Sequence, residues 1–146
     1  MLDKNEMKIA FPSFSSNESF ARAAISAFVA QLDPTVDELT DIKTAVSEAV
    51  TNCIIHAYRD RIGMIYITVA IDPAGEVTVK IRDKGCGIED VPKAMEPLFT
   101  TGGSERAGLG FAVMQSFMNR VSVRSKPGVG TTVTLKKKIQ SRRIGA

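Results

Sequence analysis

The sequence predicts an α+β fold, a two-layer α/β sandwich in which a mostly antiparallel sheet carries its helices on one face. Two β-type runs, 64–71 and 77–82, are joined by the turn Asp72-Pro-Ala-Gly75 and predict an antiparallel hairpin. A second pair of runs, 121–125 and 131–137, follows a turn pattern of the same kind. Because helical patterns precede and separate these hairpins, the order favours such a sandwich over a doubly wound parallel sheet.

The first elements are expected to be a strand and a helix. Met7-Lys-Ile-Ala-Phe11 alternates apolar and polar residues as a half-buried strand does, and Pro12 limits that strand to an edge or an end. From Glu18 to Leu32 apolar residues recur at helical spacing, which predicts an amphipathic helix that ends before Pro34.

A longer helix is expected from about Val36 to Tyr58. Its apolar positions are spaced so that they form one continuous buried stripe: Ile42, Ala45, Val46, Ala49, Val50, Cys53, Ile54 and Ala57. A last helix is expected to open at Gly108 and to end near Met118, between the two hairpins.

Length and composition predict a single domain over residues 1–146, because 44% hydrophobic residues in a chain of this length support one core. The first residues lack a signal-peptide pattern and no apolar run approaches the roughly 20 residues of a membrane span, so we expect a cytoplasmic protein without a membrane partner.

Much of the net charge of +3 falls in Lys136-Lys-Lys138 and Arg142-Arg143. Without interleaved aromatic residues, this pattern predicts a solvated C-terminus and no direct nucleic-acid binding. Cys53 and Cys86 lack metal or redox spacing and are expected to be reduced, structural thiols.

Polar residues within the long helix form the first candidate for chemistry. Glu48, Asn52 and His56 are spaced i, i+4 and i+8 and therefore lie along one line of the helix surface. Asn52 falls at the edge of the apolar stripe and Glu48 one step further out, a border that faces a cleft. There Asn52 can offer an oxygen to Mg²⁺, and Glu48 can accept a proton from an attacking hydroxyl. Ordinary polar positions on an amphipathic helix are the alternative, and His56 is expected to be a packed helix residue.

A second candidate, Asp83-Lys-Gly85-Cys-Gly87, stands where a strand ends. The glycines Gly85 and Gly87 let the backbone turn sharply and approach a flat ligand closely. Asp83 is a hydrogen-bond acceptor that suits an exocyclic amino group such as that of adenine. A plain turn is the alternative.

The third candidate is a glycine-rich segment over residues 97–110 that leads into a helix. Free backbone N–H groups at a helix start favour phosphate, and glycines at both ends predict a lid over nucleotide. The residues expected to contribute are Thr100, Thr101, Ser104, Arg106, Gly108, Leu109 and Gly110. A flexible surface loop is the alternative.

Other nucleotide motifs are absent from the sequence. Gly108 is followed by Leu109 where a P-loop has lysine, and Val113 breaks the dinucleotide-binding fingerprint. The strand-borne lysine and His-Arg-Asp set of eukaryotic-type protein kinases is missing as well.

The order Glu48-x-x-x-Asn52, Asp83-x-Gly85-x-Gly87, Gly108-x-Gly110 and Gly130-Thr131 resembles the boxes of the gyrase, Hsp90, histidine kinase and MutL ATP-binding superfamily. This resemblance implies a Bergerat-type fold that binds ATP or ADP with Mg²⁺. It implies that Asn52 holds Mg²⁺ and that Asp83 binds the adenine amino group. Thr131 would support the adenine near Asp83, and Gly108 and Gly110 would face the phosphates.

Within that superfamily, three stretches resemble the bacterial sporulation anti-sigma-F factor family: 17–22, 47–56, and 97–101 with 105–111. The resemblance implies a homodimer that sequesters a sporulation sigma factor and phosphorylates a serine on an anti-anti-sigma protein. The anti-sigma-B kinase of the stress response is the nearest alternative. Gly102-Gly103 departs from the family, which has a basic residue and a slightly longer lid there, and so puts one phosphate contact in doubt.

The chain length argues for a stand-alone kinase and switch. A histidine kinase needs a separate helical domain with the phosphorylated histidine, and an ATPase clamp needs a transducer domain. A binding module that uses nucleotide only to set its affinity for a sigma factor stays open. Arg22 lies outside the ATP boxes, and we expect a partner or dimer face there, with a solvated helix residue as the alternative.

Overall fold

The structure, a computed structural model, describes residues 4–96 and 110–140. In chain order its elements are β1 (Asn5–Pro12), α1 (Asn17–Val29), the 3₁₀ turn η1 (Ala30–Leu32), α2 (Val36–Thr51), the π-helical turn η2 (Asn52–Ala57), β2 (Met64–Ile71), β3 (Glu76–Asp83), α3 (Val91–Ala94), α5 (Phe111–Phe117), β4 (Arg120–Lys126) and β5 (Gly130–Lys138).

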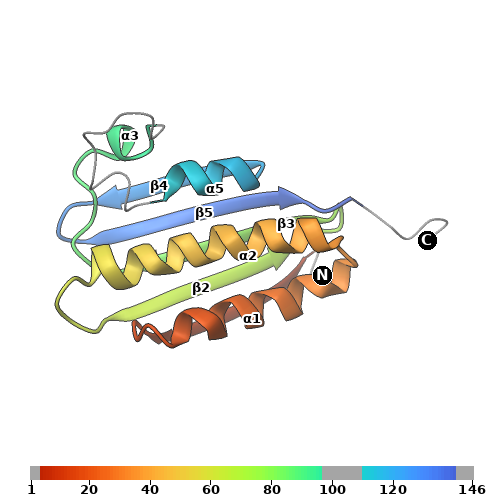
Figure 1. Ribbon diagram of the computed structural model, residues 1–146, viewed down its shortest axis with the longest axis horizontal. Coiled ribbons are helices and arrows are strands. Elements are labelled where there is room, and N and C mark those ends of the chain that lie inside the picture. The colour runs from red at the N-terminus through yellow and green to blue at the C-terminus, as the bar shows by residue number, and fades with distance from the viewer. Residues whose placement is uncertain (1–3, 97–109, 141–146) are drawn as a thin grey trace.

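The five strands form one sheet in the order β1-β2-β3-β5-β4, and every neighbouring pair is antiparallel. Figure 1 shows α1, α2 and α5 on the same side of this sheet, with α2 between the other two. The expected α+β sandwich, with an antiparallel sheet and its helices on one face, is confirmed. The position of β5 beside β3 is the feature that later brings distant parts of the sequence together.

The core lies between the two layers. Alternate residues of the strands point toward the helices and are buried, among them Ile67, Val79 and Leu135. They meet the apolar stripe of α2, in which Val46 and Val50 are fully buried. This is the stripe expected from the spacing of the apolar residues, and it holds α2 across the middle of the sheet.

The long helix differs from the expectation at its C-terminal end. It begins with a capping box, in which Thr35 Oγ1 accepts from the Glu38 amide at 3.1 Å and Glu38 accepts from the Thr35 amide at 2.9 Å. At Asn52, however, the α-helix gives way to the wider π-turn η2. The apolar spacing continues through this turn, so the pattern alone does not distinguish the two forms. Such π-turns are frequent at functional sites.

Lys136 and Lys137 fall within the strand expected over 131–137, and the structure extends this strand to Lys138, so these lysines are part of the sheet and not of a solvated C-terminal tail. Lys136, Lys137 and Lys138 belong to β5, and alternation along a strand separates them between the two faces of the sheet. Lys137 points toward the helices and pairs with Asp41 at 3.2 Å. Lys136 and Lys138 therefore lie on the other face. Residues 141–146, including Arg142 and Arg143, are outside the described residues.

Candidate functional site

Four polar side chains are buried in the described parts of the chain: Ser13, Asn52, Asp83 and Thr131. Three of these are predicted site residues, although they are up to 79 positions apart in the sequence. Burying a polar group is unfavourable unless its hydrogen bonds are satisfied, so such a group calls for a structural or chemical reason. The arrangement around Asp83 supplies one.

Asp83 ends β3, and its carboxylate is held on several sides. Its Oδ1 accepts from the Gly85 amide at 2.9 Å and from the Thr131 amide at 3.2 Å, while the Cys53 thiol lies 3.5 Å from Oδ2. Burial raises the pKa of Asp83 above its ordinary value, and the hydrogen bonds from Gly85, Cys53 and Thr131 lower it in part. The carboxylate is thus a rigid acceptor at the end of a strand.

Thr131 comes to Asp83 because β5 pairs with β3, and these two residues are direct partners in the register. The Thr131 hydroxyl lies 2.8 Å from the hydroxyl of Ser125, which also accepts from the Ile88 amide at 2.7 Å. Ser125 thereby connects β4 to the segment that follows the two predicted glycines. The expected proximity of Thr131 to Asp83 is present in the structure.

The glycine turn after Asp83 packs against η2. A Cβ atom on Gly85 would lie 2.4 Å from the Ala57 carbonyl oxygen, and the next amide, that of Cys86, donates to this same oxygen at 3.1 Å. Glycine is required at position 85 by this close approach rather than by its own dihedral angles. On its other side, next to Gly87, the turn contacts the β4–β5 hairpin, because the Gly128 amide donates to the Cys86 carbonyl at 2.7 Å. The turn therefore connects η2 to the β4–β5 hairpin.

Glu48 and Gly110 meet although the sequence separates them by 62 positions. Gly110 has a φ of 64°, in the left-handed region, and a Cβ there would lie 2.0 Å from Glu48 Oε1. The last glycine of the predicted phosphate segment therefore lies directly against the predicted base. Glu48 is half-buried on α2, one turn before Asn52.

Asn52 is 9% exposed and stands at the junction of α2 and η2, as close to the apolar stripe as its spacing predicts. No cluster of three or more His, Cys, Asp or Glu side chains that could hold a metal occurs in residues 4–96 and 110–140. A carboxamide oxygen is a suitable ligand for Mg²⁺, which commonly takes one or two protein oxygens and fills its other positions with phosphate oxygens and water. The donor set near Asn52 fits this mode of binding rather than a protein-only cage.

The rest of the predicted phosphate segment lies outside the described residues. This applies to Thr100, Thr101, Ser104, Arg106, Gly108 and Leu109, and to Gly102 and Gly103. Their expected contacts with phosphate remain predictions.

Arg22 is not a simply solvated residue. Its Nε lies 2.9 Å from Glu18 Oε2 one turn earlier on α1, and that same oxygen accepts a short hydrogen bond from Ser47 on α2. Arg22 is half-buried and contributes to the contact between the two helices. A partner face at this position stays a prediction.

Three residues that shape the site were not predicted as site residues from the sequence. Cys53 was expected to be only a structural thiol, yet it faces Asp83, and burial followed by the charge of Asp83 raises its pKa well above the ordinary value. Tyr58 donates to the Met64 carbonyl at 2.6 Å and accepts from the Lys84 amide at 2.6 Å, which fixes the turn after β3. Ser125 is the third. Only their position next to a predicted box could have indicated them.

Comparison with known proteins places this geometry in a family. A family model described as "Histidine kinase-like ATPase domain" matches residues 14–137. An anti-sigma F factor of Thermoanaerobacter sp. is 56% identical over 94% of this chain and 96% of its own length. The anti-sigma F factors of Caldanaerobacter subterraneus and Halalkalibacterium halodurans are 58% and 54% identical, each over 92% of this chain and over 94% and 92% of their own lengths.

Solved structures agree on the fold. The RsbU and RsbW domains of a Mycobacterium tuberculosis protein match with a TM-score of 0.67 and 19% identity, over 92% of this chain and 32% of that one. The histidine kinase domain of a blue-light activated histidine kinase from Erythrobacter litoralis matches with a TM-score of 0.58 and 19% identity, over 84% of this chain and 61% of that one. Within residues 4–96 and 110–140, no helix is both long and apolar enough to cross a membrane.

Proposed function

Because the chain belongs to the histidine kinase-like ATPase domains and, within them, to the anti-sigma F factor family, we propose that it binds Mg-ATP, holds a sporulation sigma factor, and phosphorylates a serine of an anti-anti-sigma protein. We propose that a single domain performs all three tasks. The alternatives are a stress-response sigma factor as the partner, or a nucleotide-dependent binding module without transfer activity.

The observation that carries this proposal is the convergence of four separate boxes on one end of α2. Glu48 and Asn52 come from α2 and its junction with η2, Asp83 from β3, Gly110 from the start of α5, and Thr131 from β5. No local feature of the chain requires these residues to meet. A buried carboxylate acceptor beside a helix-borne carboxylate and carboxamide supports a purine nucleotide whose phosphates extend toward Gly110.

The role of Asp83 follows from its hydrogen bonds. Oδ1 already accepts from the amides of Gly85 and Thr131, whereas Oδ2 is contacted only by the Cys53 thiol at 3.5 Å and keeps a lone pair for the amino group of adenine. Guanine presents a carbonyl where adenine has this amino group, and a carboxylate would repel that oxygen. We therefore expect selection of adenine over guanine nucleotides.

Glu48 is proposed as the general base. The hydroxyl of the substrate serine attacks the γ-phosphorus, its oxygen forms the new P–O bond, and the bond to the β-phosphate oxygen breaks so that ADP leaves with the electron pair. Glu48 takes the proton of the hydroxyl. Gly110, which has no side chain, leaves the carboxylate room to face that hydroxyl. Arg106 is proposed to stabilise the charge that develops on the phosphoryl group.

Asn52 is proposed as the protein ligand of the magnesium ion. When bound, Mg²⁺ neutralises charge on the phosphate oxygens and orients them. The part of Asn52 is to present its carboxamide oxygen at a fixed depth, because the position is buried where α2 changes to η2.

The proposal is tested by transfer of labelled γ-phosphate from Mg-ATP to a purified anti-anti-sigma protein, with and without this chain. Serine labelling that requires both proteins is the expected result. Glu48→Gln should abolish labelling while nucleotide affinity stays within about twofold, because the amide cannot accept the proton. Absence of transfer, together with nucleotide-dependent capture of a sigma factor, would favour the binding module.

A further inference from the structure

On the face of the sheet turned away from the helices, side chains outside the nucleotide site form regular rows. The strand registers align one residue from each of the five strands in a row across this face. One row, in sheet order, is Lys8, Thr68, Lys80, Thr134 and Ser122. The adjacent row is Ala10, Tyr66, Arg82, Thr132 and Arg124.

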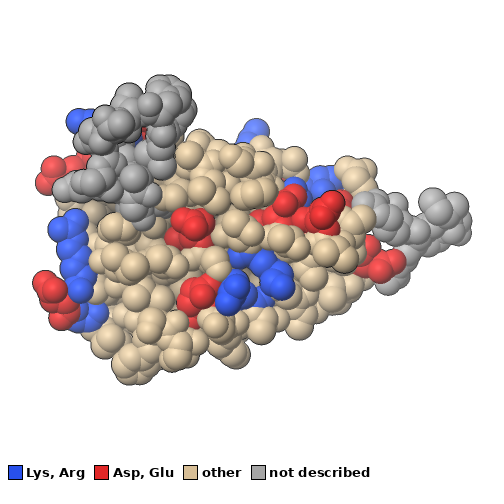
Figure 2. Space-filling view, viewed as in Figure 1, with Lys and Arg blue, Asp and Glu red and all other residues tan. Residues whose placement is uncertain are grey.

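These two rows carry four basic side chains, Lys8, Lys80, Arg82 and Arg124, and no acidic one. The remaining positions are hydroxyl residues, an alanine and one tyrosine. The helix-covered face is different, because Figure 2 shows acidic and basic residues side by side over its helices. Within these two rows the basic side chains have no counter-charge between them, which raises the local potential and attracts an acidic partner. Glu6 and Glu76 lie on the same face, in rows outside these two.

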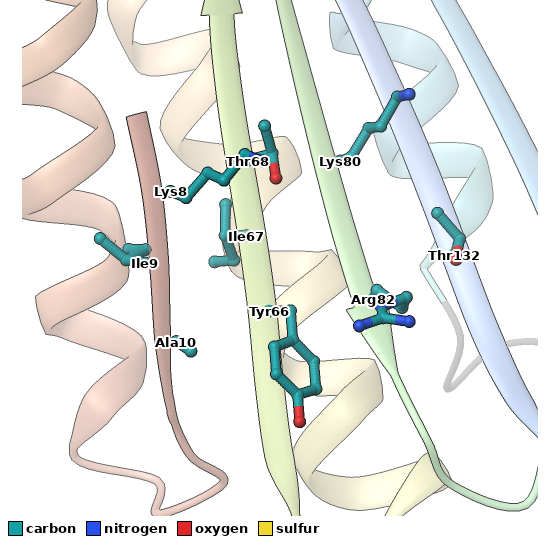
Figure 3. A pocket seen from close by; sticks show the side chains of 9 residues that line it. All are labelled: Lys8, Ile9, Ala10, Tyr66, Ile67, Thr68, Lys80, Arg82 and Thr132. Carbon is teal, nitrogen blue, oxygen red and sulfur yellow. The ribbon is translucent and has the colours of Figure 1, made fainter. Parts of the chain in front are cut away.

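The rows also border a groove. It has a volume of about 470 Å³ and is lined by residues of β1, β2, β3 and β5, including Ala10, Tyr66, Ile67, Lys80 and Arg82. Figure 3 shows the side chains of Tyr66, Lys80 and Arg82 on the near side of the strands, with the helices behind the sheet, whereas Ile67 points into the core between the layers. The groove therefore has an apolar part beside its cations and lies on the face opposite the helix layer.

Tyr66 indicates which kind of acidic partner fits. The Arg82 guanidinium lies 4.7 Å from the centre of its ring and the Lys84 ammonium 5.2 Å from it. Because cations already contact the ring, it is not open for stacking of a nucleobase, which single-stranded nucleic acids use on such surfaces. A second copy of this chain, face to face, would bring the same cations together. A polypeptide with carboxylates satisfies the cations without needing the ring.

We propose that this groove, bordered by Lys8, Lys80 and Arg82, binds an acidic helix of a partner protein that crosses the strands. Lys8 and Lys80 are two strands apart in the sheet, which separates them by about 9–10 Å. Seven residues of an α-helix advance about 10.5 Å, so carboxylates at positions i and i+7 match these two lysines. An apolar side chain between them would enter the groove near Ala10 and Tyr66.

The test uses the full chain and a fluorescein-labelled, alanine-rich helical peptide that has glutamates seven residues apart and a leucine between them. Anisotropy titrations compare it with a scrambled peptide of the same composition and with an oligothymidylate of the same charge. We expect the ordered peptide to bind more tightly than either. Lys80→Glu should weaken this binding about fivefold, because attraction of the peptide glutamates becomes repulsion. Lys43→Glu, at an exposed position of α2 on the other face, should leave the binding unchanged.

Each other outcome overturns the proposal. Equal loss with Lys80→Glu and Lys43→Glu would mean that net charge alone attracts the peptide. Equal binding of the scrambled peptide would show that the seven-residue spacing of the glutamates does not matter. Tighter binding of the oligothymidylate would indicate a nucleic-acid surface. Adenine nucleotide binding in the same Lys80→Glu sample confirms that the variant is folded, and it separates this proposal from the one on the opposite face.

Discussion

Asp83 affects folding stability and nucleotide binding in opposite directions as the pH changes. Its folded-state pKa is raised, mainly by burial, so protonation favours the folded chain and the contribution of Asp83 to the free energy of unfolding falls as pH rises through this interval. Adenine, in contrast, needs the ionised acceptor. We therefore expect affinity for ADP to fall as the pH is lowered toward the raised pKa. Calorimetric titration from neutral to mildly acidic pH measures this, and a flat profile would argue against Asp83 as the adenine acceptor.

Asp83→Asn separates the two effects. The amide keeps an oxygen for the Gly85 and Thr131 amides but presents NH₂ where Oδ2 stood, so it removes the buried charge and the acceptor together. We expect ADP affinity to fall by about tenfold or more while the midpoint of urea unfolding stays the same or rises. Loss of both binding and stability would mean that the charge itself holds the turn.

Gly110 tests the link between the phosphate segment and the base. Alanine at this position would strain a left-handed backbone and clash with Glu48 Oε1. Gly128→Ala is the matched control, since its φ is 78° and nothing lies within 4 Å of the added Cβ. Both should lose roughly 1–2 kcal/mol in the free energy of unfolding measured with urea. Only Gly110→Ala should also lose phosphate transfer, and equal transfer by the two variants would contradict the positioning of Glu48 by this contact.

At the scale of elements, Lys137 connects three of them. Its ammonium on β5 pairs with Asp41 of α2 at 3.2 Å and donates to the Phe117 carbonyl at the end of α5 at 2.8 Å, and the side chain is only 13% exposed. Lys137→Met should therefore lower the free energy of unfolding by about 1–2 kcal/mol. Lys136→Met, on the open face, should change it little. Urea unfolding of the pair checks this, and equal stability would mean that the connection contributes nothing.

The same lysines show what the sequence could and could not predict about elements. Strand β2 has the bounds expected from its period-two alternation, because burial on one face leaves a clear pattern. The strand expected over 131–137 includes Lys136 and Lys137, but lysines give no apolar signal of burial, so the pairing of Lys137 with Asp41 could not be predicted. The change from α2 to η2 at Asn52 was missed because both helical forms bury the same stripe.

At the scale of the molecule, the box residues were predictable but their contacts were not. The order of motifs predicted Asp83 and Thr131 as members of one site, whereas their direct pairing depends on β5 lying beside β3, which hairpin patterns do not specify. In the same way, the meeting of Glu48 with Gly110 depends on α5 packing next to α2. Cys53 was predicted only as part of the apolar stripe and Ser125 only as part of a strand, so neither has a pattern that marks it as a site residue.

Because the site is built from elements of the one core, nucleotide binding and global stability should be coupled. Leu135→Ala, at a fully buried position of β5, should lower the free energy of unfolding by about 2–5 kcal/mol, a large part of the roughly 5–15 kcal/mol typical of a domain. Mg-ADP at about 100 times its dissociation constant should restore about 2.7 kcal/mol, since only the folded chain binds it. Thermal unfolding with and without Mg-ADP measures the recovery. Asp83→Asn, tested at the same nucleotide concentration, should recover about 1.4 kcal/mol or less, given a loss of affinity of about tenfold or more. A recovery of the full size in that variant would mean that the nucleotide binds elsewhere.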